Sequence, residues 1–562
     1  MQLFTPGARR TAGALLILTA AALPATAAAA AKTPDLATYA DQLLAKSYPA
    51  GKPGASAIVI KDGKAVLRKG YGTANLELGV PVSPDMVFEL GSITKQFTAA
   101  AILLLQERGQ LRVEDDITKY LTDFPTDGKA VTIENLLTHT SGVPSYTGLP
   151  EWRPRVREEM KLDTLIGLFK GKPLEFNPGE SWAYSNSGYI LLGAIIEKAS
   201  GKTYEQFVEE EIFQKLGMKD SRYGHADEVT PRRASGYTQG PDGVRNAEYL
   251  SMTQPYAAGS LMSTVDDLAV WARALTSEAL LKKPSLDRMF TPYHLKSGKN
   301  TGYGYGIGVG RLEGRQVLKH NGGIFGFSTD MIVIPEERLV VAVLCNSDAA
   351  DPRPDDMTLR IAAKALGKPI EDWKAVALDP KTLQEYAGTY KFDGDTVRYI
   401  TAEGAKLFSQ RKGGEKKEIL ASARDEFYFE DAQARLHFRR DAQGKVTGVD
   451  MDFLAGVPEA GTRTDEPLPK EKQAVQVDPQ IYDDYAGEYE LAPGFSIVVT
   501  REGDHLMAQP TGQPKLEVFP ESETVFFLKV VDAQLEFVRG EGGKVTGVIL
   551  HQGGRNREGK RK

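Results

Sequence analysis

A serine and a lysine three residues apart, Ser92 and Lys95, form the pattern in this sequence that most directly suggests chemistry. The stretch from Ser92 to Arg108 is apolar nearly all round and predicts a buried helix, in which residues three apart share one face. An amine beside a serine hydroxyl can take its proton and make the oxygen a nucleophile. The side chain of an exposed lysine has a pKa of about 10.4. This role therefore requires the helix to bury the amine, because burial lowers that pKa.

The same spacing recurs at Ser409 and Lys412, so the pattern alone is not decisive. The second copy lies among short segments that predict strands, where no helical turn would bring the two side chains together. We therefore expect Ser92, and not Ser409, to be the nucleophile. The alternative for Ser92 is that it only caps its helix.

A second polar group, Tyr184-Ser185-Asn186, precedes another predicted apolar helix and is the only Tyr-x-Asn in the chain. A phenol beside a lysine ammonium can accept a serine proton and later return it to a leaving group. The amide of Asn186 can donate to a substrate carbonyl and accept from Lys95. Alternatively, Tyr184 is a half-buried core residue and Asn186 caps the helix that follows.

The third group, His320 with Gly322 and Gly323, stands at the end of a predicted strand. Glycines let a substrate backbone approach closely, and an N–H after the histidine could form an oxyanion hole with the N–H of Ser92. An ordinary hairpin turn is the alternative, since the same pattern recurs at His551.

The elements that must position these groups follow from the patterning of the first two thirds of the chain. Residues 54–71 predict a hairpin with Asp62-Gly63 as its turn, residues 302–345 predict further strands, and residues 356–366 predict a closing helix. A strand pair, a helical middle and more strands indicate an α+β domain. We expect an antiparallel sheet flanked by helices, with an added helical lobe.

The last third of the chain contains an internal repeat. Tyr386 and Tyr390 recur as Tyr485 and Tyr489, and several other residues match at the same spacing. These further pairs are Phe427 with Phe526, Leu436 with Leu535, and Phe438 with Phe537. Each copy consists of short strand patterns with Gly and Asp turns, which predicts a small antiparallel β-barrel. A polar, proline-containing spacer at 466–472 separates the copies.

The N-terminus has the pattern of a signal peptide. Arg9-Arg10 precede an apolar run at 11–23, and residues 27–31 offer small-residue cleavage sites. We expect residues 1–31 to be removed and the mature chain to be periplasmic or secreted; a retained membrane anchor is the alternative. No later stretch is apolar enough to span a bilayer. The expected parts are then 1–31, a catalytic domain at 32–368, and barrels at 376–464 and 475–562.

Composition excludes several classes of function. A net charge of −6 argues against a nucleic-acid partner, and 41% hydrophobic with 26% charged residues is typical of a globular chain. Cys345 is the only cysteine and lies in an apolar run, so we expect no intrachain disulfide and an inert, buried thiol. Without a second cysteine or a His-Glu-x-x-His motif, the sequence indicates no metal site, and we expect no cofactor. The Gly-x-Ser-x-Gly elbow of α/β-hydrolases is also absent.

Four segments together resemble the serine β-lactamase and penicillin-binding-protein-like superfamily: residues 88–97, 136–142, 184–186 and 320–322. The resemblance covers residues 50–368 and is closest to class C β-lactamases, D-Ala-D-Ala carboxypeptidases, D-aminopeptidases and related esterases. It implies a β-lactamase-like fold. The two C-terminal domains look lipocalin-like, and their placement is similar to that in bacterial D-aminopeptidases.

The resemblance also implies roles for individual residues. Ser92 would be the acylated nucleophile, Lys95 its activating partner and Tyr184 the general base. Asn186 would bind substrate and Lys95. His320 would lie on an edge strand and face the substrate. Gly322 and Gly323 would lie beside it, with the Gly323 N–H in the oxyanion hole. His139 would be a structural residue.

One departure from the family pattern guides the choice of function. Class C β-lactamases carry Lys-Thr-Gly where this chain has His320-Asn-Gly, which favours a peptidase, amidase or esterase. We expect a secreted serine hydrolase that forms an acyl-enzyme, D-aminopeptidase-like, with a small peptide, amide or ester substrate that could derive from peptidoglycan. The alternatives are a D-Ala-D-Ala carboxypeptidase or class C-like β-lactamase, and a non-catalytic cell-envelope binding protein. The oligomeric state stays open.

His320 leads to a conditional expectation about pH. If a cationic His320 holds a substrate carboxylate, substrate affinity should fall between roughly pH 6 and 8, because histidine titrates near about 6.5. If the ring is a neutral donor, affinity should hold.

Overall fold

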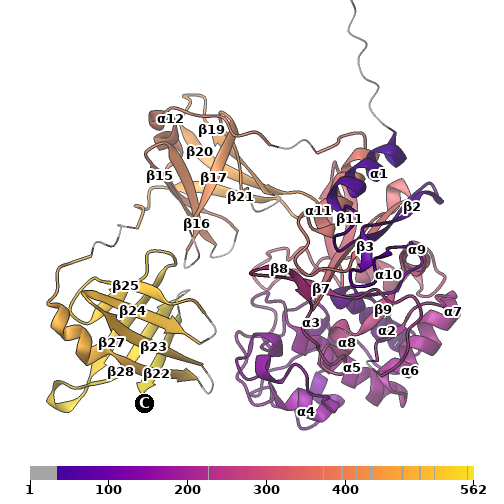
Figure 1. Cartoon of the computed structure of the whole chain (residues 1–562), viewed down its shortest axis with the longest axis horizontal. Coiled ribbons are helices and arrows are strands. Elements are labelled where there is room, and N and C mark those ends of the chain that lie inside the picture. The colour runs from indigo at the N-terminus through magenta and orange to yellow at the C-terminus, as the bar shows by residue number, and fades with distance from the viewer. Residues whose placement is uncertain are drawn as a thin grey trace, which may run out of the picture. The chain divides into compact units, whose positions relative to one another are not determined.

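A computed structural model describes residues 35–562 (Figure 1), except 226, 371–372, 394–395, 413, 415, 431–433, 470–471, 473, 493–494, 512 and 553–554. The expected signal peptide at 1–31 lies outside the described residues. Within the described part, no helix is both long and apolar enough to cross a bilayer.

The centre of the first domain is a six-stranded antiparallel sheet in the order β10-β11-β12-β13-β1-β2. Its strands are β1 Ala55–Lys61, β2 Lys64–Tyr71, β10 Gly308–Leu312, β11 Arg315–Ile324, β12 Phe327–Ile334 and β13 Leu339–Cys345. The predicted hairpin is confirmed, and both turn residues, Asp62 and Gly63, have positive φ as a tight two-residue turn requires. β1 pairs with β13, so the first hairpin lies beside the strand of this sheet that comes last in the sequence.

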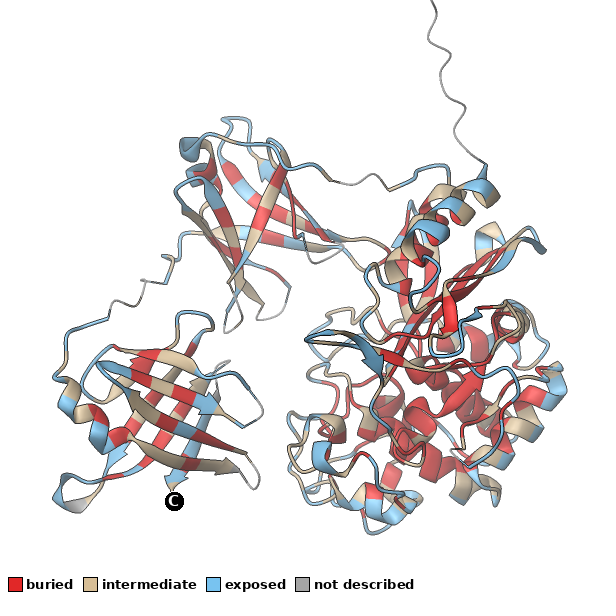
Figure 2. Cartoon of the chain, viewed as in Figure 1, coloured by how far each residue is buried: buried red, intermediate tan, exposed pale blue. Residues whose placement is uncertain are grey.

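Helices cover both faces of this sheet. One face packs on α1 (Leu36–Ser47) and α11 (Pro354–Ala365), and the other on α2 (Thr94–Glu107), α5 (Asn186–Ser200) and α9 (Val265–Leu275) (Figure 1). Every residue of β12 and β13 is buried, because alternate side chains enter the two cores. Figure 2 shows the same concentration of buried residues in the strands and in the helices around α2 and α5.

Shorter elements complete the first domain. The helices are α3 Ile133–Leu137, α4 Leu162–Gly167, α6 Tyr204–Val208, α7 Gln214–Leu216, α8 Tyr256–Gly259 and α10 Lys283–Met289. The strands are β3 Thr73–Asn75, β4 Val80–Pro81, β5 Phe88–Glu89, β6 Arg222–Tyr223, β7 Tyr237–Gly240, β8 Gly243–Asn246 and β9 Leu261–Ser263. The predicted helix at 92–108 begins differently from the prediction: a 3₁₀ turn at Gly91–Ile93 carries Ser92, and α2 starts only at Thr94.

The last third of the chain forms two closed eight-stranded antiparallel barrels, which confirms the expectation from the repeat. The first consists of β14 Gly388–Lys391, β15 Val397–Glu403, β16 Lys406–Arg411, β17 Lys416–Ala423, β18 Glu426–Tyr428, β19 Ala434–Arg440, β20 Val446–Phe453 and β21 Glu459–Thr464. The second consists of β22 Gly487–Ala492, β23 Phe495–Glu502, β24 His505–Pro510, β25 Leu516–Pro520, β26 Val525–Phe527, β27 Ala533–Arg539, β28 Val545–Gln552 and β29 Arg555–Arg561. Each barrel follows a short helix, α12 (Pro380–Tyr386) or α13 (Tyr482–Tyr485).

Each barrel closes by pairing its first strand with its last, β14 with β21 and β22 with β29. Closure removes the exposed strand edges that an open sheet would present. The repeated aromatic residues fill the two interiors in the same way, with Tyr386 and Phe438 in contact in one barrel and Tyr485 and Phe537 in the other.

Candidate active site

Ser92 is held at the sheet by the glycine that precedes it. Gly91 has a φ of +53°, and a Cβ there would lie 2.9 Å from the Gly323 nitrogen. The Leu90 carbonyl accepts a hydrogen bond from Thr329 Oγ1 of β12 (2.8 Å). No side-chain capping bond is present at the start of the 3₁₀ turn or of α2, so Ser92 is not the cap of its helix.

Gly322 is required for this close contact. A Cβ on Gly322 would lie 1.9 Å from the Leu90 carbonyl oxygen and 2.3 Å from Thr329 Oγ1, whereas a Cβ on Gly323 would meet nothing within 4 Å. The space at Gly322 is therefore used by the protein itself and not by a substrate. Gly323 is exposed and leaves its backbone beside Gly91, one residue before Ser92.

The Lys95 amine is completely buried and lies next to Ser92. Its Nζ is 3.1 Å from Ser92 Oγ, 2.8 Å from Asn186 Oδ1 and 2.8 Å from the Ala258 carbonyl oxygen. Burial lowers the pKa of the Lys95 amine well below its ordinary value. A neutral amine has two N–H groups for the two oxygens that can only accept, which leaves its lone pair for the hydroxyl of Ser92.

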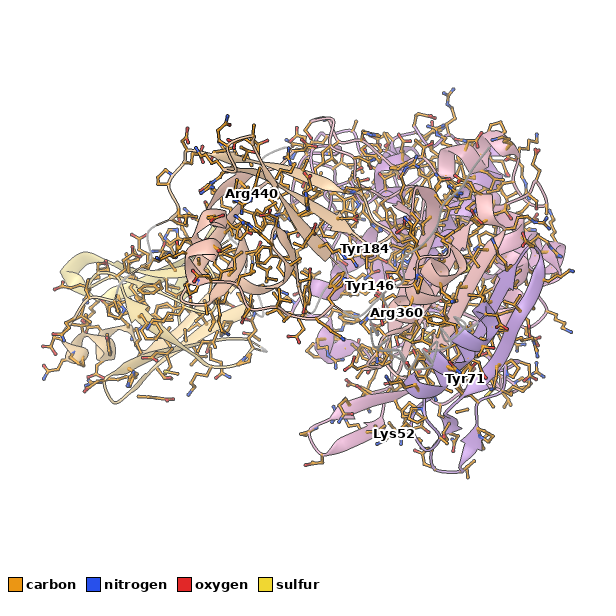
Figure 3. The ribbon with its side chains drawn as sticks, turned by 90° about the horizontal axis from the view of Figure 1, so that it is seen from above. Lys52, Tyr71, Tyr146, Tyr184, Arg360 and Arg440 are labelled. Carbon is orange, nitrogen blue, oxygen red and sulfur yellow. The ribbon has the colours of Figure 1, made fainter. Side chains whose placement is uncertain are left out.

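Tyr184 faces the same pair from the segment before α5, and Figure 3 labels it on the catalytic domain. Lys95 Nζ lies 4.8 Å from the centre of its ring. Burial raises the pKa of the Tyr184 phenol, and the neighbouring Ser92 hydroxyl opposes only part of that rise. In the resting site the phenol therefore keeps its proton.

Asn186 is the first residue of α5, and the cap of that helix is Ser185, whose side chain accepts from the Gly188 N–H. The alternative reading of Asn186 as the cap is therefore wrong. Its Nδ2 donates to Thr147 Oγ1 (3.1 Å), which turns Oδ1 toward Lys95.

His320 is buried and neutral. Its Nδ1 lies 2.6 Å from the Asn321 carbonyl oxygen, and its Nε2 lies 2.8 Å from the Tyr303 hydroxyl. Because a carbonyl oxygen can only accept, Nδ1 carries the proton and Nε2 accepts from Tyr303. Burial lowers the pKa of His320 to about 3. Both ring nitrogens are thus occupied within the protein, which argues against a cationic His320 at neutral pH.

The strand that carries His320 is not the edge of the sheet as the resemblance implied, since β11 lies between β10 and β12. However, β10 pairs with β11 only as far as Lys319, opposite Gly308. From His320 to Ile324, β12 is the one partner of β11 among the described strands. This end of the strand therefore has a free backbone edge beside Gly91.

His139 contacts Tyr184 and Ser185 of the Tyr184-Ser185-Asn186 segment. It has a φ of +60°, and its Nδ1 accepts from the Ser185 N–H (3.1 Å). Its ring lies against Tyr184, with ring centres 4.2 Å apart, and burial lowers the pKa of the imidazole well below its usual value. These contacts agree with a structural role.

The other serine and histidine patterns lie in the barrels. Ser409 is buried on β16, a strand, and accepts from Arg398 (3.3 Å). His551 is on β28, with its Nε2 2.8 Å from Glu536 Oε2. Neither pattern has the helix or the lysine contact found at Ser92.

Sequence reasoning did not identify Tyr303, Ala258 or Thr147 as parts of the site. Tyr303 belongs to an alternation of glycine and tyrosine at the start of residues 302–345, which indicates strands and gives no sign of a contact with histidine. Ala258 acts through its backbone carbonyl, which no residue type can reveal. Thr147 lies in a 3₁₀ turn at Tyr146–Gly148 without a motif of its own.

A cavity of about 310 Å³ opens beside Ser92. Its lining is mostly apolar and includes Gly91, Ser92, Tyr146, Thr147, Trp152, Asn186, Leu250, Pro255, Ala258, Gly259, Gly323, Ile324, Phe325 and Asp348. This volume is at the lower end for small-molecule sites and suits a small acyl group. The described residues contain no cluster of three or more histidine, cysteine, aspartate or glutamate side chains suited to a metal ion.

Comparisons with known proteins agree with this geometry. Residues 40–366 match the sequence profile of the family described as Beta-lactamase, and residues 372–464 and 471–561 each match a domain of unknown function, DUF3471. Penicillin-binding protein 4* of Bacillus subtilis (strain 168) is 30% identical over 407 residues, covering 68% of this chain and 89% of that protein. A D-aminopeptidase of Gluconobacter oxydans (strain 621H) is 26% identical over 451 residues, covering 73% and 83%.

Among solved structures, a D-stereospecific amidohydrolase from Streptomyces sp. superposes with a TM-score of 0.52 and 27% identity. The match covers 60% of this chain and 100% of that one.

Proposed function

The chain belongs to the beta-lactamase family of serine hydrolases, and from that premise we propose that it cleaves small amides and peptides through an acyl-enzyme on Ser92. The observation that carries the proposal is the buried Lys95 amine, 3.1 Å from Ser92 Oγ. Burying an amine costs free energy unless it is paired or neutral, and such groups concentrate at sites of chemistry.

In the proposed mechanism, neutral Lys95 takes the proton of Ser92 as Oγ attacks the substrate carbonyl. The backbone N–H groups of Ser92 and Gly323 stabilise the resulting oxyanion. Tyr184 then donates its proton to the leaving amine and recovers a proton from the Lys95 ammonium. In the second half of the reaction, Lys95 takes a proton from the attacking water and returns it to Ser92 Oγ as the carboxylic acid leaves.

This assignment differs from the role that the family resemblance gives to Tyr184. Its raised pKa disfavours the phenolate, and the lowered pKa of Lys95 favours the neutral amine. We therefore propose Lys95 as the acceptor of the serine proton and Tyr184 as the donor to the leaving group.

Amides of D-amino acids are the proposed substrate class. The similarity to a D-aminopeptidase and to a D-stereospecific amidohydrolase supports it. A D-Ala-D-Ala carboxypeptidase is the second candidate, supported by the similarity to penicillin-binding protein 4*. It is less favoured because no lysine, arginine or histidine is among the described residues that line the cavity, so a terminal carboxylate would have no cationic partner there.

The test is a substrate panel with a nucleophile control. D- and L-aminoacyl amides, short esters, nitrocefin and a D-Ala-D-Ala peptide would be offered to the wild type and to Ser92→Ala. We expect hydrolysis of D-aminoacyl amides and short esters, loss of both in Ser92→Ala, and covalent labelling of Ser92 by a fluorophosphonate. Undiminished hydrolysis in Ser92→Ala would contradict the proposal. It would favour the alternative in which this site binds a ligand without catalysis.

We also propose that the protein is exported to the periplasm or the medium. Support comes from the Arg9-Arg10 pair, the apolar run at 11–23 and the alanine-rich residues 27–31. Expression with and without residues 2–31, followed by cell fractionation and intact mass, tests this. A mature chain starting near Lys32 outside the cytoplasm is expected, and an unprocessed cytoplasmic chain would overturn the proposal.

A further inference from the structure

One charged side chain stands out in the cavity beside Ser92. Among its described lining residues Asp348 is the only acid, while Tyr146, Trp152, Leu250 and Phe325 give the cavity its apolar character. Asp348 itself is half-buried. The mechanism proposed above makes no use of this carboxylate.

The backbone of neighbouring segments fixes Asp348 in place. Its Oδ2 accepts from the Gly326 N–H (2.8 Å), in the turn between β11 and β12, and its own N–H donates to the Tyr237 carbonyl oxygen (3.2 Å). Gly326 has a φ of +84° and packs closely on Gly236. These hydrogen bonds place the carboxylate at the end of the strand pair that carries Gly323.

Among the described residues, only one of the two carboxylate oxygens has a hydrogen-bond partner: Oδ2 accepts from Gly326, whereas no hydrogen bond to Oδ1 and no ion pair of Asp348 is present. Arg153, which lies 4.7 Å from the Phe325 ring centre, is paired instead with Glu248 (2.6 Å). A negative charge with an open acceptor thus faces a cavity whose described lining includes no cation.

We propose that Asp348 binds an ammonium group on the acyl side of the substrate and makes the enzyme selective for amino-acid amides with a free amine. This inference rests on the proposed function, because it assigns a specificity residue to the same site. A charge-assisted hydrogen bond to Oδ1 would both hold the amine and orient the carbonyl toward Ser92. The apolar remainder of the cavity takes the substrate's hydrocarbon portion.

The decisive variant is Asp348→Asn, which keeps the shape and the acceptor for Gly326 but removes the charge. kcat/KM would be measured for D-phenylalaninamide, for its N-acetyl derivative and for a neutral short ester. We expect the wild type to prefer the free amine by about ten- to a hundredfold, the range for hydrogen bonds to charged groups. Asp348→Asn should bring that ratio close to one by lowering kcat/KM for the free amine.

A matched control is Glu248→Gln, which also replaces a carboxylate by an amide but lies outside the cavity lining. It should keep the wild-type ratio. A wild type without preference for the free amine, or an Asp348→Asn variant that retains the preference, would overturn the role of Asp348. Loss of ester turnover and of Ser92 labelling in the wild type would instead mean that the proposed function itself fails.

Two further comparisons of compounds locate the ammonium group on the substrate, and both use the wild-type enzyme. N-acetyl-D-lysinamide against N-acetyl-D-norleucinamide tests a side-chain amine, whereas the D-phenylalaninamide pair tests the α-amine. Benzylamine against benzyl alcohol, as competitive inhibitors of ester hydrolysis by the wild type, tests the charge directly. We expect benzylamine to bind about tenfold or more tightly; equal inhibition would contradict the proposal.

Discussion

The Lys95 amine contacts three oxygens. Asn186 Oδ1 and the Ala258 carbonyl oxygen can only accept a hydrogen bond, whereas the Ser92 hydroxyl can also donate one. This difference in hydrogen-bonding capacity decides which group receives the serine proton. The Asn186 amide is itself oriented by Thr147, so the proton position depends on a chain of contacts from α5 to α2. Residues outside the reacting pair therefore contribute to the reactivity of Ser92 by fixing geometry.

The first prediction concerns the pH dependence that Lys95 imposes. A base works only when unprotonated, so kcat/KM for a neutral ester should rise with pH through the lowered pKa of Lys95 and level off above it. In Lys95→Arg, kcat/KM should fall by about a hundredfold or more, and its rise with pH should disappear, because arginine does not deprotonate. The exposed Lys283→Arg is the control and should keep both. A limb that survives in Lys95→Arg would assign it to another group.

The second prediction concerns His320. With its pKa lowered to about 3, this ring should not change its charge between pH 5 and 8. ¹⁵N-histidine NMR should show a neutral ring with the proton on Nδ1 over that range, identified by the signal lost in His320→Asn. The spectra of His320→Asn, recorded at the same pH values, serve as the control. A His320 signal that shifts near pH 6.5 would restore the cationic alternative.

At the scale of elements, the sheet depends on a group of polar residues between β12 and α11. Asp330 of β12 is buried and lies in hydrogen-bonding contact with Thr358, whose Oγ1 is also 3.2 Å from the Asp355 carbonyl oxygen. Burial raises the pKa of Asp330 to about 7, while the hydrogen bond with Thr358 and, to a smaller extent, the charges of Lys319 and Arg353 oppose the rise. A protonated carboxyl can donate to Thr358, and Thr358 can then donate to Asp355.

The third prediction follows from this raised pKa. The folded chain keeps a proton on Asp330 that the unfolded chain releases above about pH 4, so this group should reduce the free energy of unfolding as pH rises from about 4 to 7. The reduction is at most about 4 kcal/mol. Asp330→Asn should remove this dependence, and denaturant titrations at pH 5 and 8 measure it. The exposed Asp287→Asn should behave like the wild type, and a wild-type pH dependence in Asp330→Asn would contradict the assignment.

Local patterns were sufficient for α2, which follows Ser92, and for the first hairpin. The apolar run after Ser92 and the turn at Asp62-Gly63 predicted α2 and the first hairpin because periodicity and turn chemistry act over a few residues. The 3₁₀ turn under Ser92 was not predictable, since it depends on Gly91 packing against a distant strand. For the same reason the sequence could not show that β11 is an inner strand, or that Asp348 reaches the cavity.

At the scale of the whole molecule, the two barrels repeat one set of stabilising contacts. Arg463 of β21 donates to the carbonyls of Glu385 and Ala387 at the end of α12. Arg561 of β29 makes the equivalent bonds to Asp484 (2.8 Å) and Ala486 (2.5 Å). The sequence repeat therefore extends to the connection between each barrel and its short helix.

The fourth prediction uses this equivalence. Arg463→Met and Arg561→Met each leave carbonyl groups without a donor, which should cost about 1–3 kcal/mol in the affected barrel. Because the two sites share no residue, the losses should add in the double variant. Hydrogen exchange read by mass spectrometry on peptides of each barrel measures them separately. Arg557→Met, exposed on the same strand as Arg561, should have no effect, and exchange in Arg561→Met equal to that of the wild type would contradict the prediction.

The lone thiol of Cys345 gives the protein an intrinsic reporter. It is 1% exposed, within β13 between β1 and β12, and burial raises its pKa to about 12. A maleimide dye should therefore modify the native chain only when these strands separate. With no competing cysteine in the sequence, the labelling rate would follow opening of the central sheet without any engineered probe.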